Sequence, residues 1–347
     1  MSLPTTPEAI TADWLGTALE APVAEVTVLD RQLGTNRNAR LRVRIVGSEN
    51  APRILFVKLP PDEPQQRALV IGSGMGEREA HFYQRLATRV PLRVPDVAFA
   101  DVDDDTGNFV ILIEDVLESG CRLPEGKAGV STSFAERAMD DLAALHAELP
   151  ASDPDAAWVP GLLRMREYGV GMLEHALASR AELLSPEFAE MAQLYIDSFD
   201  LLHDLWESGS QSVVHGDAHV ANLFEDGDRP GFLDWGCFSV APPLRDVSYF
   251  LCMALSVENR RQHEKRLIER YLARREALGA PGPGFPNAWA QHQVHAGYTI
   301  VAAAPAALYG GAAVSLDPAY SAAFVERASR AVADLESAAR IRAELGL

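Results

Sequence analysis

The residues best suited to chemistry lie in two short segments of the chain. Residues 213–224 read VVHGDAHVANLF and contain a carboxylate at Asp217 and an amide at Asn222. A second carboxylate, Asp234, follows in FLDWG, twelve residues after Asn222. Oxygen ligands of this kind hold Mg²⁺ together with water and substrate phosphates, and a further carboxylate can orient an attacking hydroxyl and accept its proton. The set therefore predicts phosphoryl transfer to a hydroxyl group.

The chain between Asn222 and Asp234 contains the turn that should bring these side chains together. Residues 225–228, EDGD, are flanked by apolar residues, a pattern typical of a β-hairpin. A hairpin here places Asn222 and Asp234 at neighbouring strand ends, and Asp217 lies on the loop that precedes them. We therefore expect three oxygen-bearing side chains to converge at one place.

The sequence before this region reads as strands around one main helix, from Val23 to Val116. Leu41 and Val43 alternate with arginines, which is the period of a half-buried strand. The apolar run 54–57 predicts a buried strand that ends at Lys58. The other expected elements are a turn at 33–36, a loop at 72–76, a helix at 77–89 and strands at 96–100 and 109–113.

Beyond Val116 the pattern changes to long helices. Ser133 and Glu136 form a capping box before an apolar stripe of helical spacing. The order indicates an α+β fold with a small β-rich lobe over residues 1–116 and a larger helical lobe over residues 117–347. Further helices are predicted at 162–184, 186–206, 245–256, 264–278 and 318–344.

The composition narrows the class of protein. The 347 residues are 48% hydrophobic, which is enough for a sizeable core in two lobes. A net charge of −18 argues against a nucleic-acid-binding surface, which needs a basic stripe. Cys121, Cys237 and Cys252 show no paired spacing, so we expect a reducing compartment and no structural zinc.

No segment of the sequence favours insertion into a membrane. Glu8 and Asp13 lie where a secretory signal would be apolar, so no such signal is expected. Residues 296–316 carry no formal charge, but they are mostly Ala and Gly and are interrupted by Pro305 and Gly310. A spanning helix needs about 20 strongly apolar residues. We therefore expect a cytoplasmic protein in which this stretch forms a buried helix and loop.

The motifs resemble a known superfamily. HGDAHVAN at 215–222, LDW at 233–235 and RDVSYF at 245–250 are similar to the aminoglycoside phosphotransferases and choline kinases, above all to the bacterial phosphotransferase enzyme family. Asp217 and Asn222 have the D-x-x-x-x-N spacing of the protein-kinase catalytic loop, and Asp234 takes the place of the D-F-G aspartate. The likeness implies a protein-kinase-like fold, ATP and Mg²⁺ as cofactors, and a small-molecule hydroxyl as acceptor.

The resemblance also implies which residues of this region take part. It makes Asp217 the catalytic carboxylate and gives Asn222 and Asp234 to magnesium. His215 would support the catalytic loop. His219 lies where protein kinases place a Lys beside the transferring phosphate, and it either hydrogen-bonds the phosphate or shapes the loop.

Two further parts of the site are implied by the same likeness. Asp246 would anchor the catalytic loop without touching substrate. Lys58, at the end of its strand, would contact the α- and β-phosphates of ATP. Glu79 on the following helix would hold Lys58 in place, with Glu77 as the alternative because the helix register is open by a residue or two. We expect this ion pair to lie at a cleft mouth and to be partly exposed.

The nucleotide base and phosphates would be bound elsewhere in the first lobe. Residues 113–116, with Glu114 and Val116, form the hinge that the likeness assigns to adenine, through backbone groups. Protein kinases close over the phosphates with G-x-G-x-x-G, whereas this chain has only LGTNRN at 33–38. Gly34 is the one glycine there that could contact the phosphates.

Other functions remain open on the sequence alone. A nucleotide-binding pseudokinase would lack a catalytic or metal-binding residue, and none is missing. A metal-dependent hydrolase could use His215, Asp217 and His219, since imidazole and carboxylate are common metal ligands. The sequence does not fix the acceptor, and aminoglycoside-, sugar-, macrolide- and choline-like compounds all remain open. The protein is expected to be a monomer or a homodimer.

Overall fold

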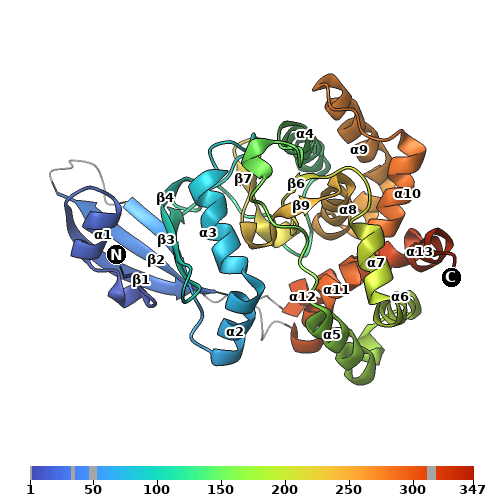
Figure 1. Cartoon of the computed structure of the whole chain (residues 1–347), viewed down its shortest axis with the longest axis horizontal. Coiled ribbons are helices and arrows are strands. Elements are labelled where there is room, and N and C mark those ends of the chain that lie inside the picture. The colour runs from blue at the N-terminus through green and yellow to red at the C-terminus, as the bar shows by residue number, and fades with distance from the viewer. Residues whose placement is uncertain (1, 33–35, 47–52, 311–317) are drawn as a thin grey trace. The chain divides into compact units, whose positions relative to one another are not determined.

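The chain divides into two compact units. The computed structural model describes residues 2–32, 36–46, 53–310 and 318–347 (Figure 1). The first unit comprises Met1–Arg89, Arg93–Arg122 and Leu233–Cys237. The second unit comprises Val90–Leu92, Leu123–Phe232 and Phe238–Leu347. The lobe boundary expected between residues 116 and 117 stays a prediction.

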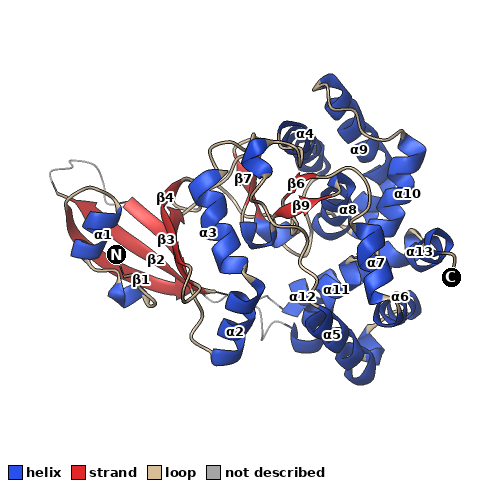
Figure 2. Cartoon of the chain, viewed as in Figure 1, coloured by secondary structure: helices blue, strands red, loops and turns tan. Residues whose placement is uncertain are grey.

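Strands dominate the first unit and helices the second (Figure 2). The elements of the first unit are α1 (Ala12–Ala18), β1 (Val23–Gln32), β2 (Arg37–Ile45), β3 (Arg53–Leu59), α2 (Pro64–Ser73), α3 (Met75–Arg85), β4 (Val97–Asp103) and β5 (Asn108–Glu114). The helices of the second unit are α4 (Thr132–Glu148), α5 (Arg166–Ser179), α6 (Pro186–Asp197), α7 (Phe199–Trp206), α8 (Pro243–Ala254), α9 (Val257–Ala277), α10 (Phe285–Ala296), α11 (Thr299–Tyr309), α12 (Pro318–Asp334) and α13 (Ser337–Leu345). Its strands are β6 (Ser212–Val214), β7 (Leu223–Asp226), β8 (Arg229–Phe232) and β9 (Ser239–Ala241).

The first unit is built on one antiparallel sheet with the strand order β1-β2-β3-β5-β4. The alternation in β2 has the predicted effect, since Leu41 and Val43 are buried and the intervening Arg42 is exposed. Leu55 and Val57 of β3 join them, and Leu15 of α1 completes the same core. Because these apolar residues fix the register of β3, they fix the position of Lys58 at its end.

Between β3 and β4 the structure differs from the prediction made from the sequence. Residues 72–76 are not a loop, because α2 continues to Ser73 and α3 begins at Met75. Gly74 joins the two helices at φ 69°, a left-handed conformation that favours glycine. Gly76 lets α3 approach the sheet closely, since a Cβ at this position would lie 2.0 Å from the Phe109 ring. The helix therefore starts earlier than predicted and ends at Arg85 instead of Arg89.

Several helix boundaries in the second unit also differ from the prediction. The N-cap of α4 is Ser131, whose hydroxyl accepts a hydrogen bond from Phe134 N, so Ser133 is not the cap. The predicted helix over 186–206 breaks at Ser198 into α6 and α7. The C-terminal prediction breaks in the same way, where Glu336 takes a left-handed conformation between α12 and α13.

The uncharged stretch 296–316 begins in α10 and continues into α11. Ala303, Ala304 and Ala307 of α11 are buried, in agreement with the expected buried helix. Within the described part of the chain, no helix is both long enough and apolar enough to cross a membrane.

Candidate active site

The candidate catalytic loop lies in the second unit and runs from the end of β6 to the start of β7. Asp246, near the N-terminus of α8, holds this loop in place by accepting two backbone hydrogen bonds. Its Oδ2 accepts from His215 N at 2.6 Å, and its Oδ1 accepts from Gly216 N at 2.7 Å. Gly216 has φ 84°, so the turn that aims both N–H groups at one carboxylate favours glycine.

The carboxylate of Asp246 is completely buried and remains ionised. Burial alone would raise its pKa, but the hydrogen bond from His146 and the N–H groups of the loop outweigh burial, and the pKa of Asp246 lies below its ordinary value. His146 Nε2 lies 3.4 Å from Asp246 Oδ2, and its Nδ1 lies 2.9 Å from the Tyr271 hydroxyl. The anchor of the loop is therefore itself fixed by α4 and α9.

Asp217 and Asn222 are in direct contact. Asn222 Nδ2 donates to the Asp217 backbone oxygen at 2.9 Å and to Asp217 Oδ2 at 3.1 Å. The 3-10 turn Val220–Asn222 makes this contact possible by reversing the chain between the two residues. The amino group of Asn222 donates both of these bonds, so its amide oxygen takes part in neither, and an oxygen of this kind suits Mg²⁺ as a ligand.

The two histidines of the loop use their rings to hold the backbone. His215 Nδ1 accepts a hydrogen bond from Asp217 N at 3.2 Å. His219 Nδ1 accepts from Ala221 N at 3.2 Å and caps the 3-10 turn, while its Nε2 lies 3.6 Å from Asp217 Oδ2. These contacts favour a loop-shaping role for His219, although a contact with phosphate through Nε2 stays a prediction.

The hydrolase alternative has little support in this geometry. Each of the two rings uses one nitrogen as an acceptor from the backbone, which sets its orientation for loop support. Among the described residues, His215, Asp217 and His219 are not a group whose donor atoms converge as metal ligands do.

Sequence reasoning missed the aromatic residues that surround Asp217. Tyr249 of α8 is buried and forms a side-chain hydrogen bond with Asp217. Burial and the neighbouring negative charge of Asp217 raise the pKa of Tyr249 well above its ordinary value, so its hydroxyl is a donor. Tyr249 lies three residues after Asp246, on the same side of the helix, and this spacing is the one signal that could have identified it.

Helix α12 also reaches this loop. The Tyr320 hydroxyl lies 3.4 Å from His219 Nδ1, and the ring of Phe324, one turn later, stands edge-on to the imidazole of His219 at 5.3 Å between centroids. Because Tyr320 follows His219 by 101 residues, no local sequence pattern indicates this contact.

In the first unit, Lys58 lies between two carboxylates. Its Nζ is 2.7 Å from Glu79 Oε1, 2.9 Å from Glu79 Oε2 and 3.4 Å from Asp234 Oδ1. Of the two glutamates that the sequence left open, Glu79 is therefore the one that contacts Lys58. The Glu77 carboxylate instead lies beside His81, one turn along α3.

The ion pair is buried, which corrects the expectation of a partly exposed pair. Lys58 is 7% exposed and Glu79 is 1% exposed. Burial alone would lower the pKa of Lys58, but the charges of Asp234 and Glu79 outweigh it and raise this pKa. The reason for the burial is local, since α3 packs closely against the segment Leu233–Cys237, where the Trp235 ring stacks on Phe82 at 3.9 Å between centroids.

The stacking of Trp235 also fixes the position of Asp234. Trp235 N donates to Glu79 Oε1 at 3.4 Å, so the backbone next to Asp234 is tied to the ion pair. Asp234 has φ 60°, a left-handed conformation that is uncommon outside glycine and is often found at functional sites. The conformation turns its carboxylate towards Lys58.

The expected hinge lies at the end of β5. The Glu114 side chain accepts two hydrogen bonds from Arg93 Nη2, both at 2.9 Å, and its backbone N–H donates to Asp96 O. The Val116 carbonyl accepts from Cys121 N at 2.9 Å. These contacts fix the segment, and its binding of adenine stays a prediction. Gly34 lies outside the described residues.

The β7–β8 hairpin forms as predicted. Leu223 pairs with Phe232 and Asp226 with Arg229, around a turn at Gly227 and Asp228. Asn222 immediately precedes β7, and Asp234 follows the end of β8 by two residues. Asp217 and Asn222 belong to the second unit and Asp234 to the first, so the convergence of all three stays a prediction.

Comparisons with known proteins agree with this fold. The model of the phosphotransferase enzyme family matches residues 36–289. No functionally curated protein matches the sequence. A solved structure from Ralstonia eutropha, provisionally described as an aminoglycoside phosphotransferase, is 19% identical, with 94% of this chain and 97% of that chain covered and a TM-score of 0.55.

Two further structures are comparable. The GDP and kanamycin complex of the aminoglycoside phosphotransferase APH(2″) is 14% identical, covers 92% of this chain and 97% of its own, and has a TM-score of 0.51. The choline kinase of Streptococcus pneumoniae is also 14% identical, covers 94% and 97%, and has a TM-score of 0.51. At these identities the likeness shows the fold, and it confirms the predicted kinase-like class with a β-rich and a helical part.

Proposed function

The chain belongs to the phosphotransferase enzyme family, a family of small-molecule kinases, and on that premise we propose that it transfers the γ-phosphate of ATP to a hydroxyl group of a small molecule with Mg²⁺ as cofactor. The observation that carries this proposal is the buried Lys58 ammonium, held by Glu79 at 2.7 Å with Asp234 at 3.4 Å. A fixed cation beside a carboxylate is the arrangement that holds nucleotide phosphates and their magnesium ion.

Lys58 would match the negative charge of the nucleotide phosphates, and Asp234 would match the positive charge of Mg²⁺. The ammonium of Lys58 would bind the α- and β-phosphates, and Glu79 would keep it in place. Asp234 and the amide oxygen of Asn222 are the hard ligands that would hold Mg²⁺, which would offset the charge of the phosphates when bound. Within the first unit, the left-handed backbone of Asp234 and its ion pair with Lys58 orient its carboxylate. Within the second unit, the hydrogen bonds to Asp217 orient the Asn222 side chain.

Asp217 would act on the acceptor. Its carboxylate would receive the proton of the acceptor hydroxyl while the hydroxyl oxygen forms a bond to the γ-phosphorus. The bond between this phosphorus and the β–γ bridging oxygen breaks, and ADP leaves with the electron pair. Hydrogen bonds from Asn222 and Tyr249 would hold the carboxylate in the orientation that the transfer requires.

The contacts of His215, His219 and Asp246 support their proposed roles, whereas the roles of the other residues rest on the family resemblance. His215 and Asp246 would fix the loop, and His219 would shape it beside Asp217. Glu114 and Val116 would present backbone groups to the adenine ring. Gly34 would lie in the phosphate loop.

The acceptor belongs to one of the classes that such folds serve. The similar structures include an enzyme bound to kanamycin and a choline kinase, so aminoglycoside- and choline-like alcohols are the first to test, followed by sugars and macrolides. The GDP in one of these complexes makes GTP the alternative phosphate donor to ATP.

The test is an ADP-release assay with ATP and Mg²⁺ against a panel of amino alcohols, aminoglycosides, sugars and macrolides. We expect turnover with one class and a loss of about 10²–10⁴-fold in Asp217→Asn, which should still bind nucleotide. The phosphorylated product identifies the hydroxyl. The proposal is wrong if no panel member is phosphorylated while the protein binds neither ATP nor GTP, or if Asp217→Asn keeps more than half of the activity.

A further inference from the structure

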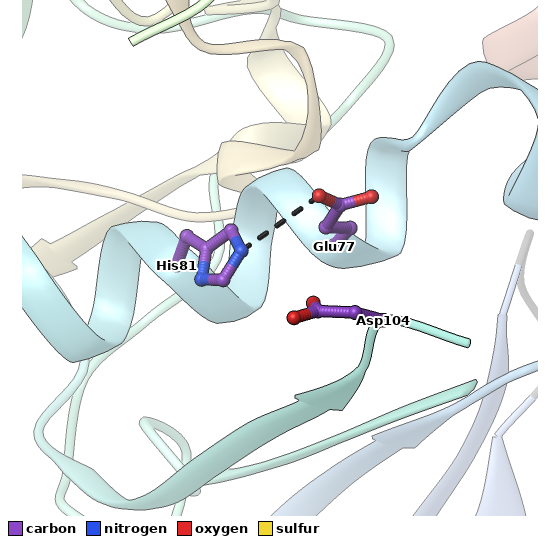
Figure 3. Close-up of side chains that lie close together, drawn as sticks. All are labelled: Glu77, His81 and Asp104. Carbon is purple, nitrogen blue, oxygen red and sulfur yellow. Dashed lines mark ion pairs between the residues drawn. The ribbon is translucent and has the colours of Figure 1, made fainter. Parts of the chain in front are cut away.

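Three side chains outside the proposed active site meet on the surface of the first unit. Glu77 and His81 lie one turn apart on α3, and Asp104 lies in the turn that follows β4 (Figure 3). One donor atom from each side chain lies within 4.8 Å of the others. Glu77 and Asp104 are exposed and His81 is half-buried, so an ion could reach them from solvent.

The orientation of the His81 ring depends on Gln84. The Gln84 amino group donates to Ala100 O at 2.9 Å and lies 3.4 Å from Asp101 Oδ1, both on β4. The amide is therefore oriented with its oxygen towards His81, and this oxygen lies 2.9 Å from His81 Nδ1. An amide oxygen only accepts, so Nδ1 must carry the hydrogen.

A metal ion would bind the ring through Nε2, because Nδ1 is held by Gln84. Nε2 lies 3.7 Å from Glu77 Oε1, on the side of the ring that faces the two carboxylates (Figure 3). The carboxylates of Glu77 and Asp104 carry like charges, and a cation bound between them and Nε2 would offset their repulsion. Histidines that bind metals almost always donate their other N–H to an oxygen acceptor in this way.

The turn that carries Asp104 is fixed by its neighbour. Asp103 Oδ1 accepts hydrogen bonds from Asp105 N at 3.0 Å and Thr106 N at 3.2 Å. The Asp103 carboxylate is thus occupied by the turn itself, whereas the Asp104 side chain extends towards α3 (Figure 3).

We propose that Glu77, His81 and Asp104 form a binding site for a divalent first-row transition metal, with Zn²⁺ as the preferred ion. One imidazole nitrogen and two carboxylate oxygens suit Zn²⁺, and they do not suit Mg²⁺, which prefers oxygen alone. Water would complete the coordination. A bound ion would offset the two negative charges and join α3 to the β4–β5 turn.

This site differs from the proposed nucleotide site in residues and in metal. Glu77 and His81 lie on either side of Glu79 in the sequence, but the Glu79 side chain is buried against Lys58. Metal binding would therefore restrain the same helix that carries Glu79 without using any residue of the proposed catalytic set. The inference does not depend on the phosphotransferase activity.

The test is a calorimetric titration of the chelator-treated full chain with ZnCl₂, without nucleotide or acceptor. We expect one saturable site, and at least about tenfold weaker binding in His81→Ala, Glu77→Gln and Asp104→Asn. Gln84→Ala, which removes the amide that orients the ring but none of the three ligands, should weaken binding by about 10–100-fold. MgCl₂ should not compete at equal concentration.

Three control variants separate this site from other binding. His175→Ala removes an exposed helical histidine of the second unit, Cys237→Ser removes a thiol, and Asp234→Ala removes the proposed magnesium ligand. All three should bind Zn²⁺ as the unmodified chain does. The proposal is overturned if the unmodified chain shows no saturable site, if the site is lost in a control variant, or if Glu77→Gln and Asp104→Asn both keep full affinity. Because no nucleotide is present, none of these outcomes bears on the proposed phosphotransfer.

Discussion

Lys58 Nζ and Glu79 Oε1 lie 2.7 Å apart, and both side chains are almost inaccessible to solvent. An exposed ion pair contributes roughly 0–1 kcal/mol to stability. A buried pair differs because loss of one partner leaves an uncompensated charge, at a cost of about 3–5 kcal/mol. The two residues therefore matter for folding as well as for the proposed binding of phosphates.

Replacement of Lys58 by Met should lower the free energy of unfolding by on the order of 3 kcal/mol at pH 8, and by less at pH 5. Burial raises the pKa of Glu79 from 4.5 to about 7, and without Lys58 it should rise further. The folded variant then binds a proton that the unfolded chain releases above about pH 4.5, so its stability falls as the pH rises. Urea unfolding at both pH values measures this difference.

The same variant should lose most of the thermal stabilisation that ATP and Mg²⁺ give the unmodified chain, since this stabilisation follows affinity. Glu77→Ala, assayed without transition metals, is the matched control and should behave like the unmodified chain in both experiments. Equal stability of Lys58→Met and the unmodified chain at pH 8 would contradict the buried ion pair.

Asp234→Ala should weaken binding of the magnesium–ATP complex and remove most of the activity. The carboxylate is a hard ligand fixed beside Lys58 by the left-handed backbone and the stacked Trp235. Nucleotide affinity measured against Mg²⁺ concentration should show a dependence in the unmodified chain that the variant lacks. Zn²⁺ should not replace Mg²⁺ in turnover, because the proposed ligands are oxygen atoms alone, which Mg²⁺ prefers. Nucleotide affinity that is independent of Mg²⁺ in the unmodified chain would refute this assignment.

Tyr249→Phe should reduce turnover about tenfold or more while the KM for ATP stays the same. The variant keeps the ring and removes only the hydroxyl that hydrogen-bonds Asp217. A hydrogen bond to a charged group contributes roughly 1.5–3 kcal/mol, and about 1.4 kcal/mol corresponds to tenfold in rate. Tyr195→Phe, which also removes one buried hydroxyl but contacts His203 of α7 instead, is the control for a purely structural loss. If both variants lower turnover equally, Tyr249 has no specific effect on Asp217.

The parts of the site that were predictable from sequence are those defined by local patterns. The alternation of Leu41 and Val43 predicted β2, and the turn residues between Asn222 and Asp234 predicted the β7–β8 hairpin. For both elements the signal comes from residues close together in the chain, where periodicity and turn chemistry operate. The contact of Glu79 with Lys58 was implied by the family resemblance, and spacing on α3 alone left Glu77 open.

What could not be predicted depends on tertiary packing. The start of α3 depends on Gly76 lying against Phe109, and no pattern near Gly76 indicates that contact. Tyr320 reaches His219 from a helix 101 residues later. The burial of the Lys58–Glu79 pair depends on the stacking of Trp235 on Phe82. Propensity and spacing describe single elements, whereas burial is decided by their neighbours.

Asp246→Asn should destabilise the chain at neutral pH, because an amide offers one acceptor oxygen where two N–H groups, those of His215 and Gly216, require two. We expect a loss of about 2–3 kcal/mol. The pKa of Asp246 lies below its ordinary value of 3.8, so its contribution is fully present above that pH. As the pH falls below 3.8, the unfolded chain binds a proton at Asp246 before the folded chain does, which favours unfolding. The contribution of Asp246 to stability is therefore lost as the pH falls through the folded-state pKa.

The difference in unfolding free energy between the unmodified chain and Asp246→Asn should therefore be constant from pH 7 to pH 5 and shrink below about pH 4. Asp141→Asn provides a control of opposite sign, since burial raises the pKa of Asp141 to about 7. Ionised Asp141 is disfavoured in the folded state, so Asp141→Asn should gain stability relative to the unmodified chain as the pH rises from 4 to 8. Urea unfolding of the three proteins across this range distinguishes the two carboxylates. A stability difference for Asp246→Asn that grows below pH 4 would mean that Asp246 does not hold the loop as a carboxylate, and that the two backbone N–H groups are satisfied in another way.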